Sequence, residues 1–222
     1  MPRGTTQEAL ALLRAHATEK DMANLKRFGI DATKPIGVSL ANIQKIAKEL
    51  GRSHELALAL WKTGWYEARL LTAFVDEPAK VTEAQMDEWC REFDNWGVCD
   101  TLCFKLFDQT PFAWKKVDEW CPAQEEFVKR GGFALLASLA GHDKKAGDAQ
   151  FLRGLGLIEQ FADDDRNFVK KGISWALRRI ASRGPVVKKE AASVAKRLAA
   201  SESPGARWVG KDALREFAKI SK

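Results

Sequence analysis

The chain has 222 residues, of which 45% are hydrophobic and 30% are charged. This composition excludes a disordered chain and allows one large domain or a short array of repeats, because enough apolar residues are present to bury a core. Lysine and arginine exceed aspartate and glutamate, which gives a formal net charge of +6 and a pI near 9.1. That balance favours an anionic partner.

The sequence shows no sign of membrane insertion or export. No segment reaches the roughly 18 consecutive apolar residues that a membrane span needs. Residues 1–6 lack the apolar core of a signal peptide. We therefore expect a cytoplasmic protein that does not bind membranes.

The four cysteines and three histidines are scattered and lack the clustered spacing of zinc sites. We expect neither a metal ion nor another cofactor. Cys99 and Cys103 lie four residues apart on an apolar helical stripe. This placement favours small hydrophobic side chains in a core over a reactive pair.

Helical periodicity continues along almost the whole chain, without a convincing strand pattern, so an all-α fold is predicted. Glycine, proline and polar breakers divide the chain into pieces of about ten to seventeen residues. The breakers are Gly29, residues 35–37, Gly51, Gly64, residues 77–78, residues 94–95, residues 110–111, Pro122, Gly141, residues 184–185 and residues 204–205.

Three pieces carry signals for a helix start. Ser39 can cap one helix, and Thr82 followed by Gln85 has the spacing of a capping box. Ser203 before Pro204 places a capping residue ahead of a proline that suits the first helical position. Helices are therefore expected to begin directly after Ser39, Thr82 and Ser203.

Short loops between these helices imply antiparallel neighbours, in five or six hairpins at intervals of roughly 30 to 40 residues. This spacing fits a HEAT-like α-solenoid better than a closed four-helix bundle. We predict a single repeat domain over residues 1–222, with a helical cap at residues 1–34 and the repeats at residues 35–222.

The segment at residues 95–107 combines an acidic and an aromatic side chain. Cys99 and its neighbours at helical spacing form a buried stripe, so Trp96 and Asp100 lie one turn apart on the flank, with Phe107 a further turn along. A carboxylate beside aromatic surface can be catalytic. It can equally be a structural hydrogen-bond partner.

The segment at residues 127–133 has two adjacent glycines within a helix. Gly131 and Gly132 cost roughly 1 kcal/mol each relative to alanine, which indicates close approach of another backbone, from protein or from nucleic acid. Arg130 lies at the edge of the apolar stripe, where its guanidinium could reach a phosphate. A surface arginine without a special role is equally compatible with this position.

Residues 166–190 hold eight basic residues and one acidic residue. At about 100° per residue, an apolar stripe faces the core, while Lys171, Trp175, Arg178 and Ser182 line up on the opposite side. Trp175 could pack against a neighbouring repeat. A large aromatic among cations is also what a protein uses to contact a nucleotide beside its phosphates.

Taken in order, ten segments of this chain resemble the AlkD-like DNA glycosylases, the DNA alkylation repair family built from HEAT-like repeats. The resemblance covers roughly residues 25–220. Its segments are residues 28–30, 36–39, 46–48, 60–61, 67–69, 96–100, 127–132, 168–171, 173–178 and 206–208. Gly97 departs from the family's pattern, in which a bulkier polar residue is common.

The resemblance implies a right-handed α-solenoid with a concave basic groove. It also implies a monofunctional enzyme that excises N3- or N7-alkylated purines, such as 3-methyladenine and 7-methylguanine, from double-stranded DNA. Asp100 would be the catalytic carboxylate, with Trp96 and Trp175 as aromatic walls at the lesion nucleotide. Arg130 would contact the DNA backbone.

Further cations near the expected DNA-contacting helices are assigned to the phosphates. These are Lys129, Lys170, Lys171, Arg178 and Arg179. The expected protein is a monomer that excises the base by hydrolysis and leaves the strand intact, since the mechanism needs no lysine nucleophile.

Two other functions remain open at this point. A HEAT-like module could bind DNA structure without catalysis, in which case Asp100 would have no chemical role. A protein-protein adaptor is the second alternative, because solenoids often serve that purpose. An adaptor would lack the steep salt dependence of a surface that grips phosphates.

Overall fold

The structure is a computed structural model that describes residues 4–220, and within this range it contains thirteen α-helices, one short 3₁₀ helix and no strand. The predicted all-α class is confirmed. The chain divides into two compact units, Met1–Thr110 and Pro111–Lys222. The boundary falls at the predicted breaker at residues 110–111. None of the described helices is both long and apolar enough to cross a membrane.

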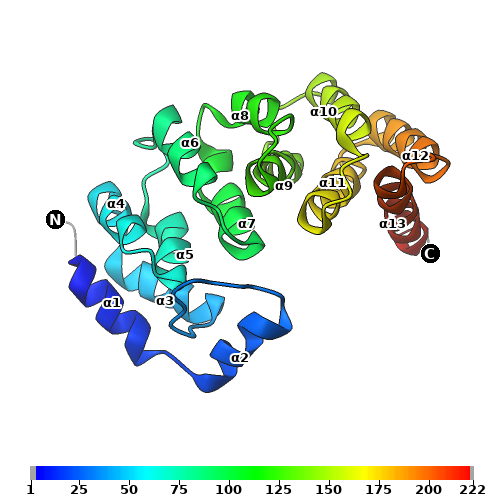
Figure 1. The fold of residues 1–222 in the computed structure, drawn as a ribbon. Coiled ribbons are helices and arrows are strands. Elements are labelled where there is room, and N and C mark those ends of the chain that lie inside the picture. The colour runs from blue at the N-terminus through cyan, green and yellow to red at the C-terminus, as the bar shows by residue number, and fades with distance from the viewer. Residues whose placement is uncertain (1–3, 221–222) are drawn as a thin grey trace. The chain divides into compact units, whose positions relative to one another are not determined.

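The first unit is built from seven α-helices and the 3₁₀ helix η1 (Figure 1). They are α1 Thr6–Ala15, α2 Glu19–Arg27, α3 Leu40–Leu50, α4 His54–Lys62, α5 Tyr66–Val75, α6 Glu83–Arg91, α7 Trp96–Lys105 and η1 Phe107–Gln109. Helix α5 is central in this unit, because it packs against α3, α4 and α7. The expected cap at residues 1–34 contains α1, which packs against α3, α4 and α5, and also α2.

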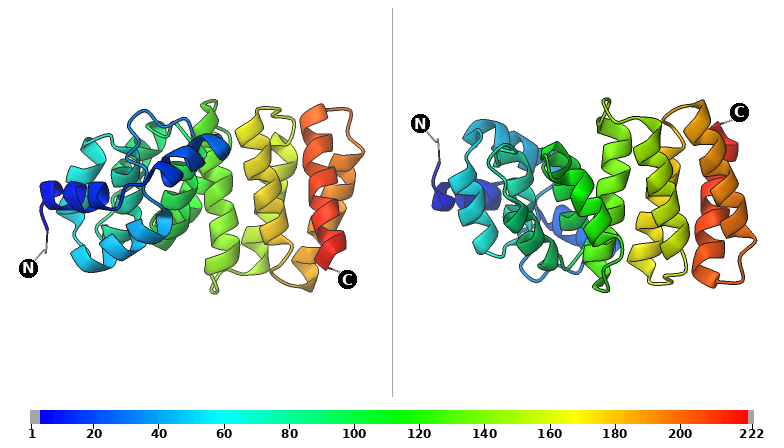
Figure 2. Two further views of the ribbon diagram at one scale, coloured as in Figure 1. Left: turned by 90° about the horizontal axis from the view of Figure 1, so that it is seen from below. Right: turned by 90° about the horizontal axis from the view of Figure 1, so that it is seen from above.

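The second unit has six α-helices in two rows. They are α8 Ala113–Trp120, α9 Glu126–His142, α10 Asp148–Phe161, α11 Asn167–Ile180, α12 Pro185–Ala199 and α13 Pro204–Ile220. Figure 2 shows α9, α11 and α13 side by side, and α8, α10 and α12 form the other row. Successive helices form antiparallel hairpins, α8 with α9, α10 with α11 and α12 with α13.

Three polar contacts between neighbouring hairpins of the second unit span the same number of residues. Arg130 donates a hydrogen bond to the carbonyl of Phe168, and Ser174 donates one to Asp212, each across 38 residues. In the other row, Arg197 pairs with Glu159 across the same 38 residues. The interval lies within the predicted range of 30 to 40 residues. Equivalent positions of neighbouring hairpins therefore meet, as a repeat array requires.

The predicted helix starts are confirmed where the sequence carries capping signals. The Ser39 hydroxyl accepts a hydrogen bond from the third amide of α3, and the Thr82 hydroxyl accepts one from Gln85 N at 3.1 Å. Helix α13 begins at Pro204, directly after Ser203. Each cap satisfies an amide that has no partner inside its helix.

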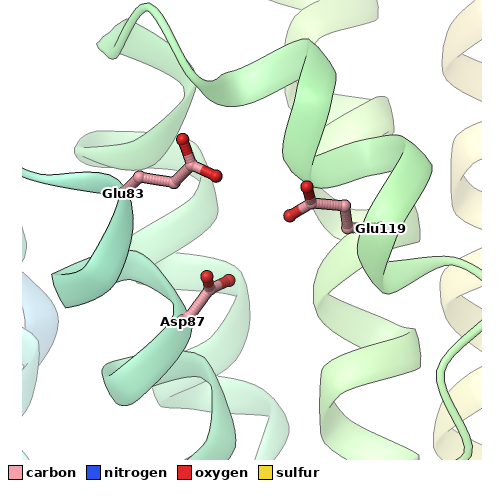
Figure 3. Close-up of side chains that lie close together, drawn as sticks. All are labelled: Glu83, Asp87 and Glu119. Atoms are coloured by element: carbon pink, nitrogen blue, oxygen red, sulfur yellow. The ribbon is translucent and has the colours of Figure 1, made fainter.

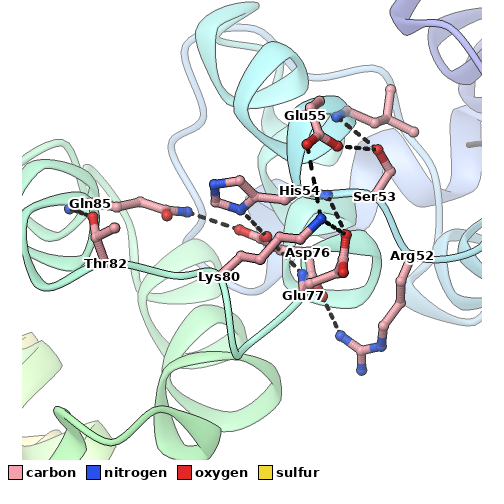
Figure 4. A network of polar contacts seen from close by, with 10 residues as sticks. Arg52, Ser53, His54, Glu55, Asp76, Glu77, Lys80, Thr82 and Gln85 are labelled. Atoms are coloured by element: carbon pink, nitrogen blue, oxygen red, sulfur yellow. Dashed lines mark hydrogen bonds and ion pairs between the residues drawn. The ribbon is translucent and has the colours of Figure 1, made fainter.

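A polar network around the buried carboxylate of Asp76 joins α4, α5 and α6 (Figure 4). Asp76 accepts hydrogen bonds from the amide of Glu77 at 2.7 Å and from the side chain of Gln85 at 2.8 Å, and it lies 2.7 Å from His54 Nδ1. The Gln85 side chain is thus directed to Asp76 and not back to Thr82. Only half of the predicted capping box is formed.

The core of the first unit is rich in aromatic rings. Trp61 and Trp89 stack with their centroids 4.3 Å apart, and Phe107 packs near Phe93 at 6.4 Å. The prediction that Phe107 extends the flank of Trp96 is wrong. Helix α7 ends at Lys105, and the change to η1 turns the Phe107 ring fully into this core.

Gly132 in α9 permits close approach of protein backbone, which is one of the two alternatives predicted from the sequence. A Cβ atom at Gly132 would lie 2.6 Å from the backbone nitrogen of Cys121, next to α8. Helix α9 ends at His142, one residue after the predicted breaker Gly141. A Cβ atom at Gly141 would collide with the guanidinium of Arg179.

We expect Gly132→Ala to lower the free energy of unfolding by about 1–3 kcal/mol, because α8 and α9 must separate to admit the methyl group. Gly156, inside α10, is a matched control, since nothing lies within 4 Å of its Cβ position. Gly156→Ala should raise stability by up to about 1 kcal/mol through helix propensity. Urea denaturation of both variants checks this contrast. Equal stabilisation by both substitutions would contradict the close packing.

Candidate functional site

Trp96 lies at the first position of α7, where the sequence sets the helix start. The Asn95 side chain accepts a hydrogen bond from Val98 N at 3.0 Å and thereby caps the helix. A Cβ atom at Gly97 would lie 2.5 Å from the buried Tyr66 hydroxyl. The departure at Gly97 from the family's pattern thus allows α7 to pack closely on α5. Burial raises the pKa of Tyr66, so its hydroxyl stays neutral.

The indole of Trp96 is held by a distant segment. Its Nε1–H donates to the carbonyl of Phe28 at 3.1 Å, across 68 residues. Phe28 itself is 57% exposed, and the Arg27 guanidinium lies 5.8 Å from its ring centroid. An exposed aromatic beside a cation thus adjoins Trp96. Nothing in the local sequence pattern identifies Phe28 as a neighbour, because the contact depends on tertiary structure.

Asp100 is partly buried and lies one turn after Trp96 on α7. The other side of this helix is fully buried and includes Cys99 and Cys103, as predicted. Burial, followed by the contact with Cys99, raises the pKa of the Cys103 thiol well above its usual value. The thiol therefore stays protonated and unreactive. Asp100 is the ionisable side chain that α7 presents beside Trp96.

A buried carboxylate anchors the loop that follows Phe28. The fully buried side chain of Glu67 accepts hydrogen bonds from the amides of Ile36 at 2.7 Å, Gly37 at 2.7 Å and Val38 at 3.2 Å. Gly37 has a φ of 90°, which favours glycine. Two of the sequence segments that carry the resemblance, residues 36–39 and 67–69, thus meet in space and fix the loop.

Two other carboxylates in the first unit, Glu83 and Asp87, lie one turn apart on α6 (Figure 3). Each of them interacts with other groups of the protein. Their charge repels phosphate. This part of α6 is therefore disfavoured as a contact for an anionic polymer.

Helix α11 has the two faces that the sequence predicts. Lys171 is exposed, and Trp175 and Arg178 are partly buried on the side opposite the core. The predicted apolar stripe is buried throughout and consists of Val169, Ile173, Ala176, Leu177 and Ile180. Trp175 is thus the large aromatic on the basic side of α11, as expected from the helical period.

Helix α13 runs beside α11 and adds residues that the sequence analysis did not assign. Trp208 lies under the ammonium of Lys170, which is 5.7 Å from the ring centroid and 2.9 Å from Asp165. Lys171 and the exposed Lys211 carry no ion pair among residues 4–220. We define the α11–α13 basic face as Lys171, Trp175, Arg178, Trp208 and Lys211.

One acidic residue interrupts this basic face. Asp212 accepts a hydrogen bond from the buried Ser174 hydroxyl at 2.6 Å and one from Arg215 at 3.0 Å, and it lies 3.9 Å from Arg178 Nε. Asp212 joins α11 to α13 and partly offsets the charge of Arg178. The net positive charge of the face therefore depends chiefly on Lys171 and Lys211.

Two residues predicted to contact DNA lie elsewhere. Lys129 is buried, with its ammonium 3.0 Å from Asp164 and 5.3 Å from the ring centroid of Phe161. Arg130 is also buried and donates a hydrogen bond to the Phe168 carbonyl at 2.6 Å. The edge position predicted for Arg130 is wrong, because α9 packs against both α8 and α11 and is buried along residues 128–140. We assign both side chains to the packing of α9 and α11.

Arg179 also points away from the α11–α13 basic face. Its guanidinium occupies the space left by the missing side chain of Gly141, and its Nε atom is buried. A cation there faces the carbonyl end of α9, where the helix dipole favours positive charge. Arg179 thus fits a structural role better than its predicted contact with phosphate.

The predicted site residues are divided between the two units. Trp96 and Asp100 lie one turn apart in the first unit, with Phe28 beside Trp96. In the second unit, Lys171, Trp175 and Arg178 share one side of α11. Each group is positioned by helices of its own unit.

Comparisons with known proteins address the family. A family model described as DNA alkylation repair enzyme matches residues 9–217. A search of curated protein sequences gave no significant match.

Two solved structures share the fold at 17% sequence identity. The first belongs to "a new family of proteins related to the HEAT-like repeat DNA glycosylases with affinity for branched DNA structures" and has a TM-score of 0.79, covering 96% of this chain and 95% of that chain. The second, smu.31 from Streptococcus mutans UA159, has a TM-score of 0.58 and covers 94% of this chain and 96% of its own. With the family model matching nearly its whole length, this HEAT-like chain belongs to the DNA alkylation repair enzyme family.

Proposed function

We propose that the protein is a DNA glycosylase that removes N3- or N7-alkylated purines from duplex DNA by hydrolysis, without cleaving the strand. The observation that carries this proposal is the partly buried carboxylate of Asp100, one turn from Trp96 on a helix whose other side is buried. Membership of the alkylation repair family supports it.

The chemistry of the lesion explains why so few catalytic groups suffice. Alkylation at N3 or N7 places a positive charge on the purine, which then leaves without a strong general acid. The remaining demand is at the sugar, where positive charge develops as the glycosidic bond breaks. A carboxylate near that sugar stabilises the charge and orients the attacking water.

Asp100 would supply this carboxylate, and Trp96 would supply the adjoining aromatic surface. Opposite unit charges about 4 Å apart attract by roughly 4 kcal/mol at an effective dielectric constant near 20. An aromatic face adds cation-π attraction of about 0.5–2 kcal/mol. The hydrogen bond from Trp96 to the Phe28 carbonyl fixes the indole, so little ordering is left to occur on binding.

The α11–α13 basic face is proposed to hold the DNA backbone. Lys171 and Lys211 offer exposed ammonium groups to phosphates, and Trp175 offers an aromatic surface beside them. Phosphate contacts of this kind position a duplex without reading its sequence. They suit an enzyme that must act wherever damage occurs.

We expect Lys171→Ala to weaken duplex binding several-fold and to reduce the slope of log affinity against log salt by about 0.9, because one phosphate contact is lost. Fluorescence anisotropy with a labelled duplex at several salt concentrations measures both quantities. Lys189→Ala, which removes an exposed cation on α12, is the control and should leave the slope unchanged. A salt-independent affinity of the wild type would instead favour a protein-protein adaptor.

A second candidate function is binding of DNA structure without catalysis. The observation that favours it is the first structural relative, which is described as having affinity for branched DNA structures. Treatment of a methylated duplex with the protein and then with alkali separates the two candidates. A glycosylase leaves abasic sites that break only in alkali, whereas a structure-binding module leaves none above the background without protein.

A further inference from the structure

The ends of three helices in the second unit border a partly open cavity to which the proposed function assigns no ligand. It has a volume of about 600 Å³ and lies where α11 and α13 end and α12 begins. Its lining includes Arg178, Ser182, Pro185, Lys188, Ala192 and Phe217. This size is typical of sites that bind small molecules.

The charged part of the lining is cationic. Arg178 and Lys188 line the cavity, and no carboxylate of residues 4–220 is part of the lining. Two acidic groups that interact with Arg178 belong to α13. They are Asp212, 3.9 Å from Arg178 Nε, and Glu216, whose pKa is lowered chiefly by its hydrogen bond from Lys219 and less by Arg178. Lys188 has no ion pair among residues 4–220, so the cavity retains a positive charge.

The start of α12 adds to this attraction for an anion. The helix begins with Gly184 and Pro185, and Gly184 supplies no side chain to cap the first amides. The positive end of the helix dipole is therefore directed to the cavity mouth, next to the two cations.

The remaining lining is apolar and includes an aromatic ring. Phe217, Pro185 and Ala192 provide surface that neither a duplex backbone nor inorganic phosphate would use. An unpaired base has an aromatic face that stacks on such a ring, and it is covalently joined to a phosphate that needs cations. The two kinds of lining thus match the two parts of one nucleotide.

The cavity adjoins the α11–α13 basic face, so DNA bound to that face can supply its ligand. Arg178 belongs to both, and it follows Trp175 by three residues on α11. Resting on the proposed function, we propose that this cavity takes up one unpaired nucleotide of bound DNA. Its base would lie on Phe217 and its phosphate between Arg178 and Lys188.

Binding of two related DNA molecules tests the proposal. One is a blunt duplex, and the other is the same duplex with a three-nucleotide single-stranded overhang. We expect the wild type to bind the overhang DNA about 5- to 150-fold more tightly than the blunt duplex. In other proteins, the stacking of one base on an aromatic side chain changes the affinity by this factor. Phe217→Leu should remove this preference while blunt-duplex affinity stays unchanged, because leucine keeps the apolar volume without the aromatic face.

Two controls keep the outcomes distinct. Leu152→Ala, an exposed apolar residue on α10, should retain the overhang preference. Equal binding of both DNAs by the wild type, or an unchanged preference in Phe217→Leu, would overturn the cavity proposal and leave the glycosylase intact. Absence of binding to either DNA would refute the proposed DNA-binding function and, with it, the cavity proposal.

A competition experiment distinguishes a nucleotide of bound DNA from a free nucleotide as the ligand of the cavity. Deoxyadenosine monophosphate in large excess should displace the overhang DNA only weakly, since a free nucleotide lacks the phosphate contacts on α11 and α13. Displacement at equal concentrations would show that the cavity serves free nucleotides, which would overturn the proposal.

Discussion

Asp100→Asn is expected to slow excision of 7-methylguanine by about a thousandfold, because about 4 kcal/mol of attraction to the developing sugar cation is lost. Affinity for the undamaged duplex should stay within about twofold, since Asp100 contributes negative charge and no phosphate contact. Single-turnover rates on a duplex with one defined lesion measure the first quantity. Anisotropy measures the second.

The asparagine variant is chosen because it keeps the size and much of the hydrogen bonding of the aspartate. Asp118→Asn serves as a matched control, because Asp118 is an exposed carboxylate on α8 that pairs with Arg153. That variant should excise the base at the wild-type rate. If Asp100→Asn retained the full rate, Asp100 would be a structural residue, and the catalytic proposal would be wrong.

Glu67→Ala is expected to lower the free energy of unfolding of the first unit by about 3–5 kcal/mol. The fully buried carboxylate accepts three amide hydrogen bonds, and its removal leaves these amides without a partner at a cost of about 1–3 kcal/mol each. Hydrogen exchange at residues 36–38 should accelerate more than exchange in α11. Thermal denaturation gives the overall loss.

A comparison variant makes this effect specific. Glu88→Ala removes an exposed carboxylate from α6 and should change stability by less than about 0.5 kcal/mol. Since the loop anchored by Glu67 follows Phe28, the Glu67 variant should also loosen the contact between Phe28 and Trp96. Slow exchange at residues 36–38 in Glu67→Ala would contradict the anchoring role.

The local features of this molecule follow directly from its sequence. A helical period of about 100° per residue is enough to place Lys171, Trp175 and Arg178 on one side of α11, because both faces of a single helix are determined by its own residues. Capping residues such as Ser39 define helix starts in the same way. These predictions needed no knowledge of neighbouring helices.

The predictions that failed concern helices that other helices cover on more than one side. Arg130 was placed at the edge of an apolar stripe and Lys129 was assigned to the phosphates, yet α9 is buried along residues 128–140. A periodicity argument assumes one buried face and one solvent face, so it misplaces residues on a helix that packs on several sides. The missed contact of Phe28 with Trp96 spans 68 residues and has no local signal.

The most direct test of the central claim measures binding and base release in the same sample of methylated duplex. We predict that excess wild-type protein binds the duplex and releases 7-methylguanine or 3-methyladenine as the free base, with the strand left intact. Complete binding without any base released above the level without protein would contradict the account, and would identify a module that binds DNA without catalysis.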